Sequence, residues 1–182
     1  MDILEILKGR RSIRKYKSEQ IKESELEKIL EAGMYAPSGM GRQSARMIVV
    51  QNPELRERLR KSNASIMNNE NIDPFYGAPT VIVVVADKTI PTYHDDGVLV
   101  ASNLMNEAYS IGIGSCYIYR AKEELETEEG KILRDELGIK ETEEGIANII
   151  LGYPDEQPEA KPRKEDLSLI HISEPTRLRC IS

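Results

Sequence analysis

The stretch from Asp95 to Ile111 limits the possible folds of this chain most strongly. Its spacing predicts a long helix, and apolar side chains cover much of the circumference of that helix. A helix of this kind must be surrounded by protein, so it should lie in the core. The continuous apolar run from Thr80 to Ala86 likewise predicts a strand that is buried on both faces of a sheet.

Shorter elements surround these two. Apolar spacing predicts helices over 2–9, from Ser24 to an end between Gly33 and Pro37, from Pro53 onward, and over 123–137 with a break near Gly130. Ser24 is expected to cap its helix, because Glu27 follows three residues later. Strands are expected over 47–50, 113–119 and 145–153, and an extended arm over 154–166. Helices and strands mix without strict alternation, which favours an α+β fold.

Composition and charge exclude some classes of function. The chain has 182 residues, of which 40% are hydrophobic and 31% charged, and this suits one globular domain. A net charge of −6 argues against sequence-independent nucleic-acid binding. No apolar run approaches the ~20 residues that cross a membrane, and the N-terminus lacks a signal-peptide core. We therefore expect a cytoplasmic protein with no nucleic-acid or membrane partner.

The last residues read differently from the rest. Leu167 to Arg177 resembles the translation of a sequencing adapter, so we expect a single domain over 1–166 and a non-native tail over 167–182. A genuine amphipathic tail is the alternative. Before the tail there is one cysteine, Cys116, and one histidine, His94, which predicts neither a disulfide framework nor a metal site.

Four segments could carry chemistry. Three arginines, a lysine and Ser12 fall between Arg10 and Lys15, a pattern that suits a bound phosphate or, read alone, a solvated basic turn. The loop from Ala36 to Gln43 has small residues that would let a flat ligand approach its backbone. Ile111 to Tyr119 holds two glycines before a strand, without the spacing of a dinucleotide-binding motif. Lys161 and Arg163 add two more cations in the arm.

Taken in order, these segments resemble the FMN-dependent nitroreductase family over essentially all of 2–166. The resemblance implies a central mixed, largely antiparallel sheet flanked by helices, with the long helix buried at its centre. It also implies a homodimer with flavin sites at the subunit interface. The family usually has asparagine where Gly41 stands and Pro-Trp where Ser44 and Ala45 stand, so the substrate pocket should differ.

The resemblance also implies roles for individual residues. The flavin phosphate and ribityl chain would be held by Arg10, Arg11, Ser12 and Arg14, and the phosphate also by Lys161 and Arg163. The isoalloxazine would be covered, from the partner subunit, by Pro37, Ser38, Gly39 and Gln43. The reactive edge of the ring would meet backbone groups of Tyr117, Ile118 and Tyr119, and its pyrimidine end would meet Asn71.

The implied activity is hydride transfer from NADH or NADPH to FMN, followed by transfer to an electron-poor acceptor such as a nitroaromatic or a quinone. Because the flavin carries the chemistry, no catalytic side chain is predicted. Two alternatives stay open. One is another FMN-dependent reduction, such as dehalogenation or reduction of an activated alkene. The other is a non-catalytic FMN carrier or sensor.

Overall fold

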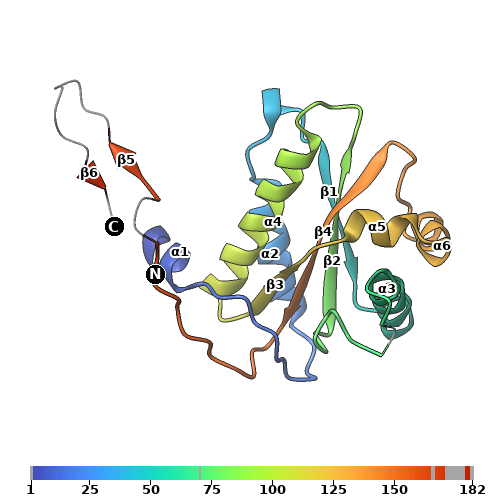
Figure 1. The fold of residues 1–182 in the computed structure, drawn as a ribbon, viewed down its shortest axis with the longest axis horizontal. Coiled ribbons are helices and arrows are strands. Elements are labelled where there is room, and N and C mark those ends of the chain that lie inside the picture. Colours follow the sequence, from blue (N-terminus) through green and yellow to red (C-terminus); the bar gives the residue numbers. More distant parts are fainter. Residues whose placement is uncertain (1, 70, 165–166, 171–178, 181–182) are drawn as a thin grey trace.

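A computed structural model of the chain describes residues 2–69, 71–164, 167–170 and 179–180. Within these residues, the main sheet has four antiparallel strands in the order β1-β2-β4-β3 (Figure 1). The strands are β1 (Ala45–Val50), β2 (Thr80–Asp87), β3 (Gly114–Ile118) and β4 (Glu143–Gly152). An isolated parallel bridge joins Ser12 to Ser115 at the edge of β3. The prediction of a largely antiparallel sheet is confirmed.

Strand β2 lies inside the sheet, between β1 and β4. Successive side chains of a strand point to opposite faces. Accordingly, Ile82 and Val84 belong to one buried apolar cluster, whereas Val81 and Val83 belong to another. All four side chains are fully buried. The strand buried on both faces that the apolar run predicts is therefore confirmed.

Helices cover both faces of this sheet (Figure 1). One face is packed by α2 (Glu23–Met34) and α4 (Tyr93–Ser110), and the other by α3 (Pro53–Ile66), α5 (Ala121–Glu126) and α6 (Glu128–Glu136). Helix α4 is the predicted core helix, and its Ala101 and Leu104 are fully buried. Its Val98 and Leu99 are nevertheless 37% and 41% exposed, so one apolar stripe faces outward in a single chain.

Two details of the helix prediction are wrong. Helix α2 begins at Glu23, and the Glu25 carboxylate accepts a hydrogen bond of 2.9 Å from the Lys22 N–H, so Ser24 is not the cap. The predicted break near Gly130 lies at Thr127, whose hydroxyl accepts a hydrogen bond of 2.8 Å from the Gly130 N–H and caps α6. Gly130 is needed for packing, because a Cβ there would collide with the Glu124 carbonyl.

The two ends of the domain lie side by side. After α1 (Ile3–Gly9), the extended segment bonds first to β3, through the Ile13 N–H and the Ser115 carbonyl at 2.9 Å. It then bonds to the C-terminal arm, where the Asp155 N–H donates to the Lys15 carbonyl at 2.9 Å. The segment is thereby fixed between β3 and the arm.

The remaining elements are short. The 3₁₀ turn η1 (Gly39–Gly41) precedes β1, and β5 (Leu169–Ile170) pairs with β6 (Arg179–Cys180) apart from the main sheet. The non-native origin of 167–182 stays a prediction. No helix in the described ranges is long and apolar enough to cross a membrane.

Candidate functional site

The extended segment after α1 has two faces, because successive side chains alternate. On one face, Ser12 and the charges of Arg10 and Arg14 lie close to the Cys116 thiol on β3. Burial raises the pKa of this thiol, while Arg14, Ser12 and Arg10 act in the opposite direction. The structure therefore brings Arg10, Ser12 and Arg14, three of the predicted phosphate-binding residues, to one face.

Acidic groups of the arm lie beside this segment: Lys15 is ion-paired with Asp155 at 3.0 Å, and the Glu156 carboxylate accepts a hydrogen bond from the Arg14 N–H. Among the described residues, Arg10, Arg11 and Arg14 form no ion pair with an acidic side chain. Other arginines do: Arg46 and Arg58, for example, are both paired with glutamates. Clustered arginines whose guanidinium groups are not engaged in ion pairs are a donor set that fits a phosphate group.

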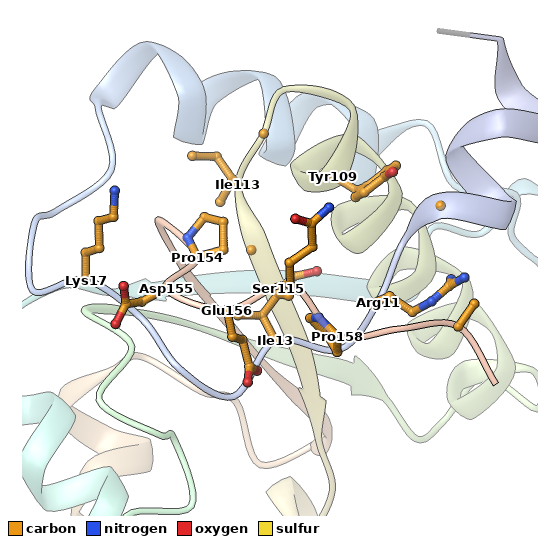
Figure 2. Close-up of a pocket in the computed structure, with 15 residues that line it drawn as sticks. Arg11, Ile13, Lys17, Tyr109, Ile113, Ser115, Pro154, Asp155, Glu156 and Pro158 are labelled. Atoms are coloured by element: carbon orange, nitrogen blue, oxygen red, sulfur yellow. The ribbon is translucent and has the colours of Figure 1, made fainter.

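Arg11 lies on the opposite face of the segment. Its guanidinium donates to the carbonyls of Lys8 at 2.8 Å and Arg10 at 2.6 Å, and so fastens the end of α1. The same side chain lines a cavity of about 730 Å³ that also includes Tyr109 and Ser115 (Figure 2). The Ser115 hydroxyl is buried and has no hydrogen-bond partner in the described part of the chain. Arg11 thus has a structural contact that Arg10 and Arg14 lack.

The predicted flavin-covering loop lies elsewhere. Pro37, Ser38 and Gln43 line a second cavity of about 220 Å³ beside α4. Within the loop, the Gln43 N–H donates to the Ser38 hydroxyl at 3.0 Å. This cavity shares no lining residue with the larger one, so the loop and Arg11 contribute to different sites within one chain.

A buried carboxylate holds this loop to α4. Asp96 is 3% exposed, and its carboxylate accepts hydrogen bonds from the Gly39 N–H at 2.9 Å and the Ser44 hydroxyl at 2.6 Å. Thr92 donates to it from 3.2 Å. Burial alone would raise the pKa of Asp96, but the bonds from Ser44, Gly39 and Thr92 hold it below its usual value. No local sequence pattern links positions 39, 44 and 96, so the role of Asp96 becomes visible only in the folded chain.

Strand β3 offers a free edge. It is the last strand of the sheet, so alternate backbone groups point away from β4 and are open to a ligand beyond the bridge at Ser115. The Ile118 side chain is buried, whereas Tyr119 is 65% exposed. The Tyr117 hydroxyl donates to the Ile146 carbonyl at 3.4 Å, on the far side of the strand from Cys116. The predicted backbone role of 117–119 suits this edge.

Three predicted residues lie in exposed segments. Asn71 follows α3, and its N–H donates to the Asn69 side chain at 3.3 Å. Lys161 and Arg163 lie in the arm beyond its pairing with residues 15–17. No ion pair in the described part of the chain joins Asn71, Lys161 or Arg163 to the arginine segment, and none of the three lines either of the two cavities above, so their roles stay predictions.

Comparison with known proteins identifies the family of this chain. The model of the Nitroreductase family matches residues 7–153. A provisionally named NADH dehydrogenase/NAD(P)H nitroreductase of Methanothermobacter thermautotrophicus is 32% identical over 169 residues, covering 87% of this chain and 80% of that protein.

Two solved structures extend the likeness to the fold. A nitroreductase with bound FMN from Bacteroides fragilis is 30% identical, with a TM-score of 0.82, over 96% of this chain and 100% of that chain. A nitroreductase with bound FMN from Desulfitobacterium hafniense is 27% identical, with a TM-score of 0.83, over 94% of this chain and 100% of that chain.

Proposed function

This chain belongs to the nitroreductase family, and we propose that it is an FMN-dependent oxidoreductase that uses NADH or NADPH. Its acceptor would be an electron-poor small molecule such as a nitroaromatic or a quinone. The observation that carries the proposal is the face formed by Arg10, Ser12 and Arg14, in which neither guanidinium group is ion-paired with an acidic side chain of the described residues. The likeness to two nitroreductases with bound FMN supports it.

Bound FMN would supply the capacity to accept and to pass on a hydride. Arg10 and Arg14 would hold the phosphate through charge-assisted hydrogen bonds, and Ser12 would add a hydroxyl donor between them. The open edge of β3 at 117–119 would present backbone N–H groups to the polar edge of the ring. Such fixed donors favour a charge that develops nearby, because they need no reorganisation during the reaction.

The exposed apolar surface supports a homodimer. Ile3, Leu4 and Leu7 on α1 are at least half exposed, and α1 packs beside α4, whose Val98 and Leu99 also face outward. Covering such a surface with a second copy would remove apolar area from water. It would also let the loop from Pro37 to Gln43 reach the flavin of the other subunit. Cytoplasmic location stays a prediction.

Two separate half-reactions test the activity. FMN-loaded protein is mixed with NADH or NADPH without oxygen in a stopped-flow instrument, and the flavin absorbance is followed. The reduced protein, freed of nicotinamide, is then mixed with a nitroaromatic or a quinone. We expect loss of absorbance in the first step and its return in the second, both faster than with free FMN. Bound flavin that neither nicotinamide reduces would instead indicate a carrier or sensor.

A further inference from the structure

We propose that Asp96 is a positioning residue, which sets the conformation of the loop from Pro37 to Gln43 before flavin binds. This inference rests on the proposed function, in which that loop covers the flavin of the partner subunit. It assigns a role to a side chain on α4 that itself lies outside the loop. The proposed role follows from the positions of the residues that donate hydrogen bonds to Asp96.

The carboxylate of Asp96 joins two points that flank the turn. One oxygen accepts from the Gly39 N–H at 2.9 Å, at the start of the turn. The other accepts from the Ser44 hydroxyl at 2.6 Å, just after the turn ends. A single ionised group can accept at both oxygens, whereas an amide in its place accepts at only one. The carboxylate is therefore suited to fix both ends together.

The backbone between these two points is strained. Met40 and Gln43 have φ angles of 54° and 48°, and Gly41 between them has 64°. A residue other than glycine adopts this left-handed conformation at a steric cost, because its Cβ approaches the following carbonyl oxygen. Such a conformation persists only where the surroundings impose it, and it is concentrated at ligand-binding sites. The bonds from Gly39 and Ser44 to Asp96 supply that constraint.

Asp96 itself is shielded from water. Asp96 lies in the first turn of α4, where the helix dipole favours a negative charge, and it is 3% exposed. Neighbouring Asp95 has the same charge, but its side chain is 86% exposed. A loop held in advance loses less conformational entropy when a ligand binds, so its affinity for the flavin should be higher.

The test compares wild type with Asp96→Asn, Ser44→Ala and the matched control Asp95→Asn. Each apoprotein is titrated with FMN by quenching of flavin fluorescence, and the visible circular dichroism of the bound flavin is recorded. Thermal unfolding and size-exclusion chromatography of each apoprotein check folding and assembly. We expect the FMN dissociation constant to rise roughly 10- to 100-fold in Asp96→Asn, the ratio for losing one charge-assisted hydrogen bond. Ser44→Ala should show a smaller rise, and both should change the dichroism.

The outcomes separate the two proposals. Wild-type protein that folds but takes up no FMN would overturn the proposed function, and this inference with it. Wild-type binding together with unchanged affinity and dichroism in both Asp96→Asn and Ser44→Ala would overturn the inference alone. If Asp96→Asn does not fold, the FMN affinity and dichroism of Ser44→Ala are compared with those of the control Asp95→Asn, and no difference between them would overturn the inference. An equal loss of affinity in Asp95→Asn would also count against it.

Discussion

The side chain of Asn148, on β4, donates a hydrogen bond of 2.6 Å to a carboxylate oxygen of Glu124, which is completely buried on α5. Asn63 donates to the same oxygen at 2.5 Å. The other Glu124 oxygen and the Asn148 amide oxygen have no partner within the described residues. A buried carboxylate with only one oxygen satisfied is costly to keep charged, so burial favours the protonated, neutral form of Glu124.

The buried Glu124 should make stability depend on pH. Burial raises its pKa from 4.5 to about 8, although Asn63, Asn148 and Arg120 oppose the rise. Between these values the folded chain keeps a proton that the unfolded chain releases, so the free energy of unfolding falls as pH rises. We expect Glu124→Gln to remove a fall of roughly 1.4 kcal/mol per pH unit across this window. Urea denaturation at pH 5, 7 and 9 measures it.

The control is Glu126→Gln, an exposed neighbour on the same helix. It should keep the wild-type pH dependence. If Glu124→Gln and wild type follow parallel curves from pH 5 to pH 9, the buried carboxyl group is not protonated as described.

Two glycines should differ in their tolerance of alanine. A Cβ at Gly130 would collide with the Glu124 carbonyl and lie 2.8 Å from the Leu125 α carbon, whereas nothing lies within 4 Å of one at Gly138. We expect Gly130→Ala to cost about 3 kcal/mol through overpacking. Gly138→Ala should cost about 1 kcal/mol, because its φ of 62° is left-handed. Chemical denaturation of both variants checks the order, and the reverse order would refute the packing at Gly130.

The ion pair between Arg46 and Glu143 should contribute more to the free energy of unfolding than an exposed ion pair does. Arg46 donates to both carboxylate oxygens at 2.9 and 2.6 Å, and the Glu143 side chain is 6% exposed. Arg46→Ala leaves this carboxylate buried and unpaired, which should cost about 2–3 kcal/mol at pH 7. Lys131→Ala, which breaks an exposed pair with Glu128, should cost less than about 0.5 kcal/mol.

The stability cost of Arg46→Ala should be smaller at low pH. Burial would raise the pKa of Glu143, but Arg46 and the Lys140 N–H lower it below its usual value. A lowered pKa contributes stability that is present above the usual value and is lost as pH falls. The cost of Arg46→Ala measured by denaturation should therefore be smaller at pH 3 than at pH 7. An equal cost at both pH values would contradict the ionic origin of the effect.

The arginine face predicts a difference between two flavins. Arg10→Ala and Arg14→Ala should each raise the FMN dissociation constant roughly 10- to 100-fold, by removing a charge-assisted bond to the phosphate. Riboflavin lacks the phosphate, so its weaker binding should change little in the same variants. Fluorescence titration with both ligands makes the comparison, and Lys131→Ala controls for net charge. Equal losses for riboflavin and FMN would place these arginines away from the phosphate.

Local patterns predicted the elements that matter most for this fold. The burial of β2 and of α4 can be predicted from their own residues, because the spacing and the content of apolar side chains are local properties of a sequence. The cap of α2 was placed wrongly because Ser24 and Glu27 mimic the motif that Lys22 and Glu25 occupy. Gly130 looked like a helix break, although its role is a close contact between helices.

The candidate site also has features that the sequence predicts and features that it does not. The family resemblance groups Arg10, Arg11, Ser12 and Arg14 at one phosphate site, whereas the side chains of the extended segment alternate and Arg11 lies on the other face. The contact of Asp96 with Gly39 joins residues 57 positions apart, and that of Glu124 with Asn63 joins residues 61 apart. Such contacts depend on how α4 and α5 pack, which no single stretch of sequence specifies.

The decisive measurement is the visible absorption spectrum of the protein after FMN is added and unbound flavin is removed. We expect flavin bands to be retained at a stoichiometric level, with the released cofactor identified as FMN. Circular dichroism and size-exclusion chromatography of the same sample establish that the protein is folded and assembled. A folded, assembled protein that retains no FMN would contradict the account.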